Sequence, residues 1–319
     1  MQAFQSQRLR PVRAGVVGMG AFGRHHAAKY EAIDGVSLFG VADVCAQARR
    51  GAAVKHGVPV FSDWRDLLGA VDVVSVCSPA ISHAAIVRAF LNAGTHVLVE
   101  KPIATKLTEA DQLIALAEAK KRVLTVGHQE RFVFARTGLL DYDDAPVSIE
   151  CWRIGGWTGR GADVSVVLDL MIHDLDLVHR LVPASLAEVE ASGRSVKSRL
   201  ADEVEAELGF DDGTQVRLSA SRVSGMRRRG MRAIYADGVI EIDFIARTVR
   251  NTTRRHLNPL MLHDPLGEAV AAFVQAAQGD GQAFVRPEEA RLALATALEI
   301  DKAMVPMALP RATGTYARA

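Results

Sequence analysis

A lysine at the end of a short apolar run is the first residue of this sequence that could do chemistry. Residues 96–99 read His-Val-Leu-Val and predict a buried strand, which Glu100, Lys101 and Pro102 terminate. Proline lacks an N–H and ionised groups are costly to bury, so the strand cannot continue. Ligands of open α/β sheets bind beyond the carboxyl ends of the strands. The sequence therefore places Lys101 at the rim of a ligand crevice.

A second segment combines carboxylates and a histidine at helical spacing. Asp169, His173 and Asp176 are four and three residues apart, so they share one face of the helix that we expect from Val164 to Leu181. An apolar helix with such a stripe is expected to turn it toward a polar cleft. A carboxylate one turn before a histidine can fix the tautomer of the ring and raise its basicity.

Together the two segments are suited to oxidising a secondary alcohol with NAD. That reaction needs a hydride acceptor, a base for the hydroxyl proton and a donor that stabilises the developing alkoxide. Our first assignment makes His173 the base, Lys101 the proton relay and alkoxide stabiliser, and Asp169 the orienting group. The exchanged assignment, with Lys101 as base, stays open, as does a structural Lys101 paired with Glu100 on a surface. No metal is expected, because no His-x-x-x-His or paired cysteine motif is present.

The N-terminal segment predicts where NAD binds. A strand over Val12–Val17 leads into G-x-G-x-x-G and a helix, and a strand over Val36–Ala42 ends in an acidic residue. This is the dinucleotide fingerprint in its proper context, with the pyrophosphate held at the helix N-terminus. The expected cofactor contacts from this motif are Gly18, Gly20, Ala21, Phe22, Gly23 and Asp43.

The acidic residue also indicates which dinucleotide binds. Asp43 can accept hydrogen bonds from the ribose hydroxyls of NAD and would repel the extra phosphate of NADP, so NAD is the predicted cofactor. Arg49 and Arg50 follow a turn or more later and are interpreted as a solvated helix face. Further cofactor contacts are expected from Ser78, Pro79, His83, Glu100, Lys101 and Gln129. For His83, a structural role at a helix N-terminus is an equal alternative.

The order of elements predicts two domains. Strands and helices alternate through residues 1–127, which indicates an α/β Rossmann domain with a parallel, doubly wound sheet that binds NAD. Residues 128–319 are predicted to form an α+β domain for substrate binding and oligomerisation, with a mostly antiparallel open sheet and hairpin turns at Asp212-Gly213 and Asp237-Gly238. Two helices, at 265–277 and 287–304, precede a tail of fifteen residues. The C-terminal helix is a candidate to pack back on the first domain.

Composition excludes several other classes of protein. The 319 residues include 49% hydrophobic residues, 38 basic and 37 acidic ones, for a net charge of +1. No bulk charge favours nucleic acid or a membrane surface, and neither partner is expected. The three cysteines are widely spaced, the N-terminus lacks the apolar core of a signal peptide, and no apolar run reaches the roughly 18 residues that span a bilayer. We expect a soluble, cytoplasmic protein that forms a homodimer or homotetramer through the open sheet.

The motifs together resemble the glucose–fructose oxidoreductase and inositol dehydrogenase family. The matching segments are AGVVGMGAFGRHH, VEKPIA and DLMIHDLDL, and the resemblance covers essentially the whole chain. In that family the lysine of E-K-P and the histidine of D-x-x-x-H form the catalytic pair. The resemblance thus assigns Lys101 and His173 as that pair, with Asp169 beside them.

Three further segments look like the family members that act on UDP-N-acetylglucosamine or its uronic acid. These segments are Val126–Phe132, Arg160–Asp174 and Ser219–Ser224. Such enzymes oxidise the sugar 3-hydroxyl to a ketone, which an aminotransferase then converts to an amino sugar for lipid A or surface polysaccharide. The relatives usually continue G-H-x-E-R-F with Asn-Pro, where this chain has Val-Phe. The resemblance adds Glu130, Arg131 and Arg160 to Lys101, Asp169 and His173 as substrate-side residues.

A UDP-sugar carries a diphosphate, which arginines bind well. Arg131, Arg153 and Arg160 are candidates, as is a cluster consisting of Arg222, Arg227, Arg228, Arg229 and Arg232. We interpret most of that cluster as a solvated hairpin rim or a dimer contact. A uronic acid would need one further arginine in the sugar pocket.

Other functions remain open at this level. Within enzymes they are dehydrogenases of a uronic acid nucleotide sugar, a free sugar or a polyol, and an NAD-dependent glycosidase that oxidises and re-reduces one carbon. A non-catalytic, dinucleotide-sensing regulator is the alternative of a different class. Intact Lys101, Asp169 and His173 argue against the regulator, because a protein that only binds has no need of a base.

Overall fold

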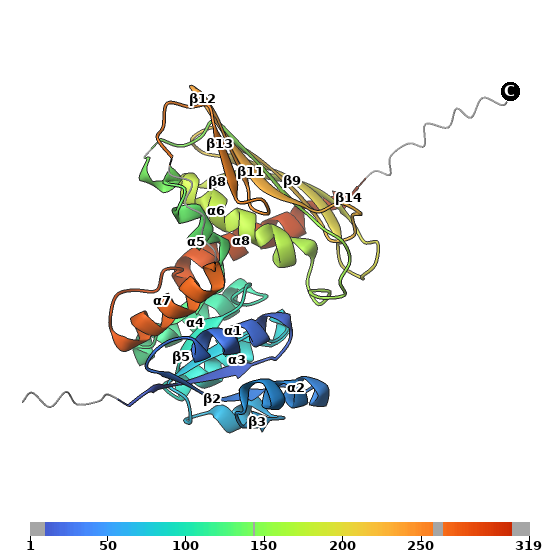
Figure 1. The fold of residues 1–319 in the computed structure, drawn as a ribbon. Helices are drawn as coiled ribbons and strands as arrows, with labels where there is room; N and C mark the ends of the chain where they lie inside the picture. Colours follow the sequence, from blue (N-terminus) through green and yellow to red (C-terminus); the bar gives the residue numbers. More distant parts are fainter. Residues whose placement is uncertain (1–9, 143, 258–263, 308–319) are drawn as a thin grey trace, which may run out of the picture.

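The computed structural model describes residues 10–142, 144–257 and 264–307. The N-terminal part is a parallel sheet with helices on both faces (Figure 1). Its strands are β1 (Val12–Val17), β2 (Val36–Ala42), β3 (Val60–Phe61), β4 (Val73–Val76), β5 (His96–Val99) and β6 (Leu124–Val126). Its helices are α1 (Ala21–Glu31), α2 (Ala46–His56), α3 (Ala80–Asn92) and α4 (Leu107–Lys120), with a short 3₁₀ turn at Trp64–Leu67. The strand order β3-β2-β1-β4-β5-β6 is that of a Rossmann fold, and it confirms the predicted doubly wound sheet.

The second part is an eight-stranded sheet in the order β13-β12-β11-β7-β10-β9-β8-β14. Its strands are β7 (Ser148–Ile154), β8 (Leu186–Arg194), β9 (Glu203–Phe210), β10 (Gln215–Ser221), β11 (Arg228–Tyr235), β12 (Gly238–Asp243), β13 (Thr248–Asn251) and β14 (Met304–Pro306). All neighbouring strands are antiparallel except the pairs β7–β10 and β8–β14. This confirms the predicted mostly antiparallel sheet, and both predicted hairpin turns join neighbouring strands.

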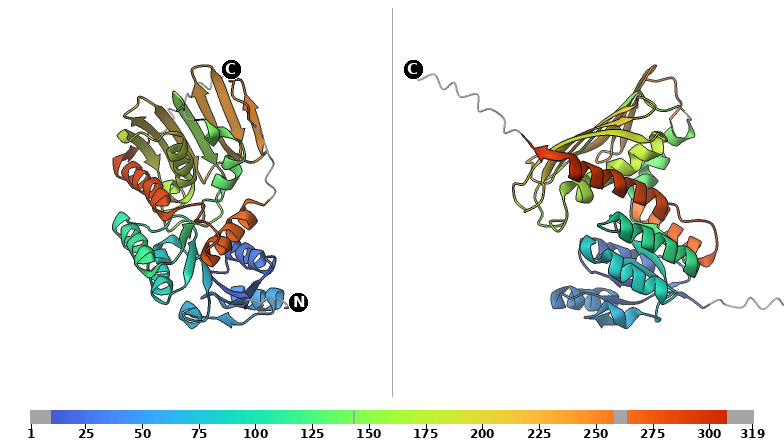
Figure 2. Two further views of the ribbon diagram at one scale, coloured as in Figure 1. Left: turned by 90° about the vertical axis from the view of Figure 1, so that its left-hand side faces the viewer. Right: turned by 180° about the vertical axis from the view of Figure 1, so that it is seen from behind.

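The helices of the second part are α5 (Glu130–Ala135), α6 (Ile172–Leu181), α7 (Pro265–Gln278) and α8 (Pro287–Ala303), with a 3₁₀ turn at Leu139–Asp141. Helices α6 and α8 cover one face of that sheet (Figure 2), whereas α7 lies against the Rossmann domain. Strand β7 alternates between half-buried and buried residues, because its buried side faces the helix layer. The same alternation in β9 leaves its glutamates on the open face of the sheet.

Four elements differ from the sequence prediction. The expected helix over Val164–Leu181 consists of a π-helical turn, Val167–Met171, followed by α6. Helix α5 and strand β13 were not predicted, because short segments carry too little periodicity to be recognised. The predicted tail begins too early, since Met304–Pro306 pairs with β8 as β14. Residues 308–319 of that tail lie outside the described residues.

Both C-terminal helices contact the first domain. Residues of α7, including Val270 and Phe273, share a hydrophobic core with Ala14 of β1 and Ala27 and Tyr30 of α1. Helix α8 packs against α6 and α4 (Figure 2), and its Arg291 forms an ion pair with Asp111 of α4. The crevice at the carboxyl ends of the Rossmann strands therefore has walls from both parts of the chain.

No helix in residues 10–142, 144–257 or 264–307 is long and apolar enough to cross a membrane.

Candidate active site

The turn between β1 and α1 is shaped to hold a dinucleotide pyrophosphate. Gly18 has φ +89°, and a Cβ there would lie 2.7 Å from the carbonyl oxygen of Cys77. A Cβ on Gly23 would lie 1.8 Å from the carbonyl oxygen of Gly18, so only glycine lets α1 start this close to the turn. The helix N-terminus has no side-chain cap and no acidic residue in its first turn. Its free N–H groups suit an anion, and these residues fit the expected cofactor.

Asp43 lies at the carboxyl end of β2, where the adenosine ribose would be held. Its carboxylate accepts hydrogen bonds from the backbone N–H of Met19 at 2.6 Å and of Cys45 at 2.7 Å, and so ties this strand end to the glycine turn. Arg50 is exposed and Arg49 is half-buried, and Nη1 of Arg49 also donates to the carbonyl oxygens of Asp43 at 2.7 Å and Val44 at 3.0 Å. Asp43 thus sits in a turn that its neighbours hold rigidly.

His83 joins two turns of the crevice wall. Its Nδ1 lies 2.7 Å from the carbonyl oxygen of Pro102 and its Nε2 lies 2.9 Å from that of Ser78. The ring is buried, and burial lowers the pKa of His83. Pro79 is the N-cap residue of α3 in the same turn. The contacts favour the structural alternative for His83, in which it fixes the turn after Lys101.

A buried polar network supports the same strand end. Oε1 of Glu100 lies 3.0 Å from Nε2 of His26 and accepts a hydrogen bond from Gln129 at 3.2 Å, while Nδ1 of His26 lies 3.0 Å from Oγ of Ser75. Burial acts to raise the pKa of Glu100, but the hydrogen bond and charge of His26 and the charge of Lys101 hold that pKa below its usual value. His26 was missed by sequence reasoning, because nothing in its spacing indicates a partner so distant in the sequence.

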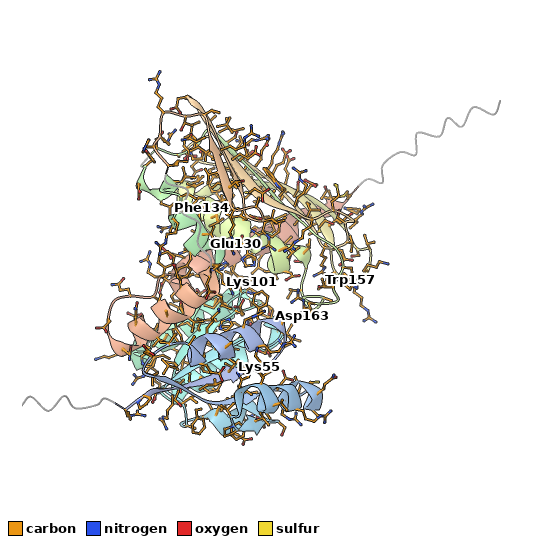
Figure 3. All side chains as sticks on the ribbon, in the orientation of Figure 1. Lys55, Lys101, Glu130, Phe134, Trp157 and Asp163 are labelled. Atoms are coloured by element: carbon orange, nitrogen blue, oxygen red, sulfur yellow. The ribbon has the colours of Figure 1, made fainter. Side chains whose placement is uncertain are left out.

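Lys101 and Asp169 meet across the two parts of the chain. Nζ of Lys101 lies 3.1 Å from Oδ1 of Asp169 and also donates to the main-chain carbonyl oxygen of that residue. The lysine side chain is only 12% exposed. Lys101 therefore does not pair with Glu100 on an open surface, and Figure 3 shows it where the Rossmann domain faces the second domain.

Asp169 has other partners than the sequence suggested. Its Oδ1 faces Lys101 and its Oδ2 lies 3.7 Å from Nη1 of Arg222. Among the residues that the structure describes, His173 makes no hydrogen bond with this carboxylate. The π-helical turn explains the difference, because it adds a residue to the turn and breaks the α-helical alignment of Asp169 with His173.

His173 lies in the first turn of α6 with its ring between the two domains. Nδ1 of His173 is buried and has no hydrogen-bond partner in the described part of the chain. The same does not hold for Nε2. The ring is 5.8 Å from that of His128, centroid to centroid. Burial, followed by the charges of Lys101 and Arg153, lowers the pKa of His173 well below the ordinary histidine value. The imidazole is therefore neutral at neutral pH and able to accept a proton.

Beside His173 lies a buried cluster of two arginines and two carboxylates. Arg153 of β7 is only 2% exposed, and its guanidinium binds Asp174 of α6 and Glu130 of α5. Arg229 of β11 donates from Nη1 to Glu130 at 2.8 Å. Arg153 is therefore already engaged by carboxylates. Arg229 is a member of the arginine cluster that differs from a solvated rim, because its side chain is half-buried in the wall of the site and its charge acts on His173.

A second buried cluster surrounds Arg131. Its guanidinium is 3% exposed, forms a bidentate pair with Asp176 of α6 and also binds Glu289 of α8. The arginine joins three helices, and removing one partner of such a buried pair typically costs about 3–5 kcal/mol. Its donors point at protein carboxylates, so the structure brings Arg131 near the site without presenting its guanidinium to a substrate.

The glycine-rich loop 155–163 lies between β7 and the π-helical turn. Figure 3 shows its Trp157 and Asp163 on the side of the second domain that faces the Rossmann domain. The side chain of Arg160 is exposed. Arg222, taken above for a rim residue, is instead 4% exposed and donates to the carbonyl oxygens of Gly161 at 2.7 Å and Val164 at 3.1 Å. Arg222 thus holds the loop against Asp169.

Comparisons with known proteins agree with this architecture. Residues 12–128 match the model of an oxidoreductase family with an NAD-binding Rossmann fold, and residues 142–241 match that of the GFO/IDH/MocA C-terminal domain. The chain is 33% identical to the UDP-N-acetylglucosamine 3-dehydrogenase of Acidithiobacillus ferrooxidans over 92% of this chain and 97% of that protein. It is 29% identical to the myo-inositol 2-dehydrogenase of Thermotoga maritima over 76% and 77% of the two chains.

Solved structures show the same fold. The structure of the Acidithiobacillus ferrooxidans enzyme superposes with a TM-score of 0.84 and 33% identity, covering 93% of this chain and 98% of that one. The WlbA dehydrogenase of Bordetella pertussis, in complex with NADH and UDP-GlcNAcA, superposes with a TM-score of 0.78 at 17% identity, covering 94% and 100%.

Proposed function

Because the chain belongs to the GFO/IDH/MocA family of NAD-binding oxidoreductases, we propose that it oxidises the 3-hydroxyl of UDP-N-acetylglucosamine to a ketone. The observation that carries the proposal is the contact of Lys101, at the carboxyl end of β5, with Asp169, near enough to His173 for the lysine charge to act on that ring, beside a turn built for NAD. The activity of the Acidithiobacillus ferrooxidans relative, at 33% identity, supports the choice of substrate.

The two residues have complementary tasks in this reaction. NAD, when bound, supplies the hydride acceptor. His173 is neutral because its pKa is lowered, so Nε2 can take the proton of the 3-hydroxyl as the carbon–oxygen double bond forms. Lys101 donates a hydrogen bond to the same oxygen and stabilises its developing negative charge. Asp169 holds the ammonium group of Lys101 in position through Oδ1 and its main-chain oxygen.

The charges around His173 favour a neutral sugar over a uronic acid. Three cations act on the pKa of His173, and each is paired with a carboxylate: Lys101 with Asp169, Arg153 with Asp174 and Glu130, and Arg229 with Glu130. A sugar carboxylate would have to compete with these protein carboxylates for a cation. An N-acetylhexosamine needs hydrogen bonds but no such exchange.

The loop 155–163 is the proposed contact for the nucleotide. Arg160 is exposed with its guanidinium available to a diphosphate, and Trp157 is 38% exposed with a face suited to stack on a base. Arg222 lies over the ring of Trp157, with its guanidinium carbon 5.7 Å from the ring centroid, and supports it. Figure 3 shows Trp157 on the side of the second domain that faces the Rossmann domain.

The proposal is tested by following NADH absorbance with NAD and each of three candidates: UDP-N-acetylglucosamine, its uronic acid and myo-inositol. A ketone trap is included, because oxidation can be unfavourable at equilibrium. We expect NADH with UDP-N-acetylglucosamine and at least about tenfold lower kcat/KM with the other two. A preference for the uronic acid would contradict the charge argument. If NAD binds but none of the three candidates gives NADH, the proposed function is contradicted and a glycosidase or a regulator is favoured.

A second copy of the chain is the proposed partner, bound through the open face of the second sheet as a homodimer or homotetramer. That face carries exposed charged side chains, among them Glu205 of β9 and Arg228 of β11, three strands away. A two-fold arrangement lets side chains of opposite charge meet across such an interface. Light scattering is expected to give a mass of two or four chains, and a monomer at micromolar concentration would contradict this.

The proposed place of the reaction is the cytoplasm, upstream of an aminotransferase that makes an amino sugar for lipid A or surface polysaccharide. A 3-keto sugar is chemically suited to that step, because its carbonyl can condense with an amine. The three cysteines, Cys45, Cys77 and Cys151, are all free thiols, as expected in a reducing compartment.

A further inference from the structure

Two histidines at the site have buried ring nitrogens that lack hydrogen-bond partners among the described residues. His128 follows β6 and is 2% exposed, and neither of its ring nitrogens has a partner among the described residues. Nδ1 of His173 is also buried and has no hydrogen-bond partner among the described residues. Buried polar side-chain atoms are nearly always satisfied in proteins, so three such atoms at one place require an explanation. The two rings lie edge to face, with an interplanar angle of 85°.

The proposed chemistry places a specific demand on His173. A neutral imidazole carries one N–H and one lone pair, and the base must turn the lone pair toward the substrate hydroxyl. Since Nε2 is the nitrogen not enclosed by protein, Nδ1 must carry the hydrogen and donate it to an acceptor inside the protein. Without such an acceptor, the opposite tautomer is available and the base is lost.

The carboxylates of this segment are engaged elsewhere. Asp169 binds Lys101, Asp174 binds Arg153 and Asp176 binds Arg131. His128, whose ring neighbours that of His173, has two ring nitrogens without a partner among the described residues, and one of them can act as the acceptor. Its backbone is fixed, because its N–H donates to Val126 at 2.8 Å and its carbonyl oxygen accepts from Arg131 at 3.1 Å.

We propose that His128 is a positioning residue that accepts the Nδ1 hydrogen of His173, directly or through one water, and so keeps Nε2 of His173 as the proton acceptor. The rings are neighbours at 5.8 Å between centroids but stand edge to face, so a direct bond requires one ring to turn. Such adjustment is common, because hydrogen bonds at catalytic groups often tighten only when ligands bind. This role rests on the proposed function of His173. It replaces the orienting role that the sequence suggested for Asp169.

The test reads the tautomer of His173 by nitrogen NMR of the full-length protein labelled with ¹⁵N-histidine, with NAD bound and no sugar present. The resonances of His173 are assigned by their loss in His173→Asn. We expect the Nδ1–H tautomer in the parent. His128→Phe keeps the ring volume but has no acceptor, so the Nε2–H tautomer should increase. His128→Gln keeps an acceptor oxygen and should restore the parental form.

Kinetics give a second readout with a matched control. We expect His128→Phe to lower kcat at least about tenfold with KM little changed, and His128→Gln to recover part of the loss. His179→Phe replaces a partly buried histidine further along α6, which bonds Thr296, and should keep the parental tautomer of His173. An Nε2–H tautomer in the parent, or an unchanged spectrum in His128→Phe, would overturn the role of His128. Because no sugar is present, the spectra stay decisive even if the substrate is another alcohol.

Discussion

Lys101→Met is expected to lower kcat at least about 100-fold, with the Kd for NAD little changed. Methionine keeps most of the side-chain volume in a position that is 12% exposed, so the fold should tolerate it. It removes the donor that stabilises the alkoxide and, within the described part of the chain, leaves Asp169 with the more distant Arg222 as its cation partner, at 3.7 Å. Loss of a donor aimed at developing charge typically costs 100-fold to 1,000-fold in kcat.

The measurement is steady-state NADH formation, together with NAD binding by isothermal calorimetry. Lys106→Met is the matched control, because this lysine side chain is 71% exposed and contacts only Glu109. Its kcat should equal that of the parent. A Lys101→Met enzyme with near-parental kcat would contradict the assigned role, whereas loss of both NAD binding and activity would show that Lys101 holds the cofactor turn.

His173→Asn is expected to lower kcat by a similar factor, at least about 100-fold, because the amide cannot accept a proton at Nε2. The Kd for NAD should again change little, since His173 belongs to α6 and not to the glycine turn. His179→Asn, on the same helix, is the control and should retain activity. If His173→Asn is active and Lys101→Met is not, the exchanged assignment holds, with Lys101 as base.

The pH profile of the parent gives an independent check on His173. Its pKa is lowered by burial and by the nearby cations, so the neutral form that accepts protons persists to a pH below that of an ordinary histidine. The acidic limb of kcat/KM is therefore expected below pH 6.5, the unperturbed value of histidine. A limb above that value would mean that another group is the base.

Sequence reasoning went furthest where the chemistry is local. The glycine turn, the strand that ends at Glu100 and the acidic residue after β2 are each encoded within a few residues, and the structure has them as expected. Placing Lys101 at the strand rim followed from topology, because every parallel sheet of this kind gathers ligands at the same edge.

The partners of the charged residues could not be predicted in the same way. Arg153 and Arg229 approach Glu130 from different strands, and this meeting depends on the order of β7 and β11 in the sheet. The π-helical turn was also invisible, because an inserted residue leaves the apolar pattern of Val164–Leu181 almost unchanged. It turns Asp169 toward Lys101, so that His128 becomes the proposed partner of His173.

The packing of α7 against α1 has a consequence for how the protein is made. Leu266, Val270, Phe273 and Val274 of α7 complete the same core as Ala14 and Val16 of β1. On the ribosome, the first domain therefore emerges about 140 residues before the segment that covers it. Its core is closed only when the chain is nearly complete, so maturation of the nucleotide-binding half waits on synthesis of the other half. The predicted domain boundary near residue 127 separates two stretches of sequence, but the N-terminal stretch alone lacks α7, which completes part of its hydrophobic core.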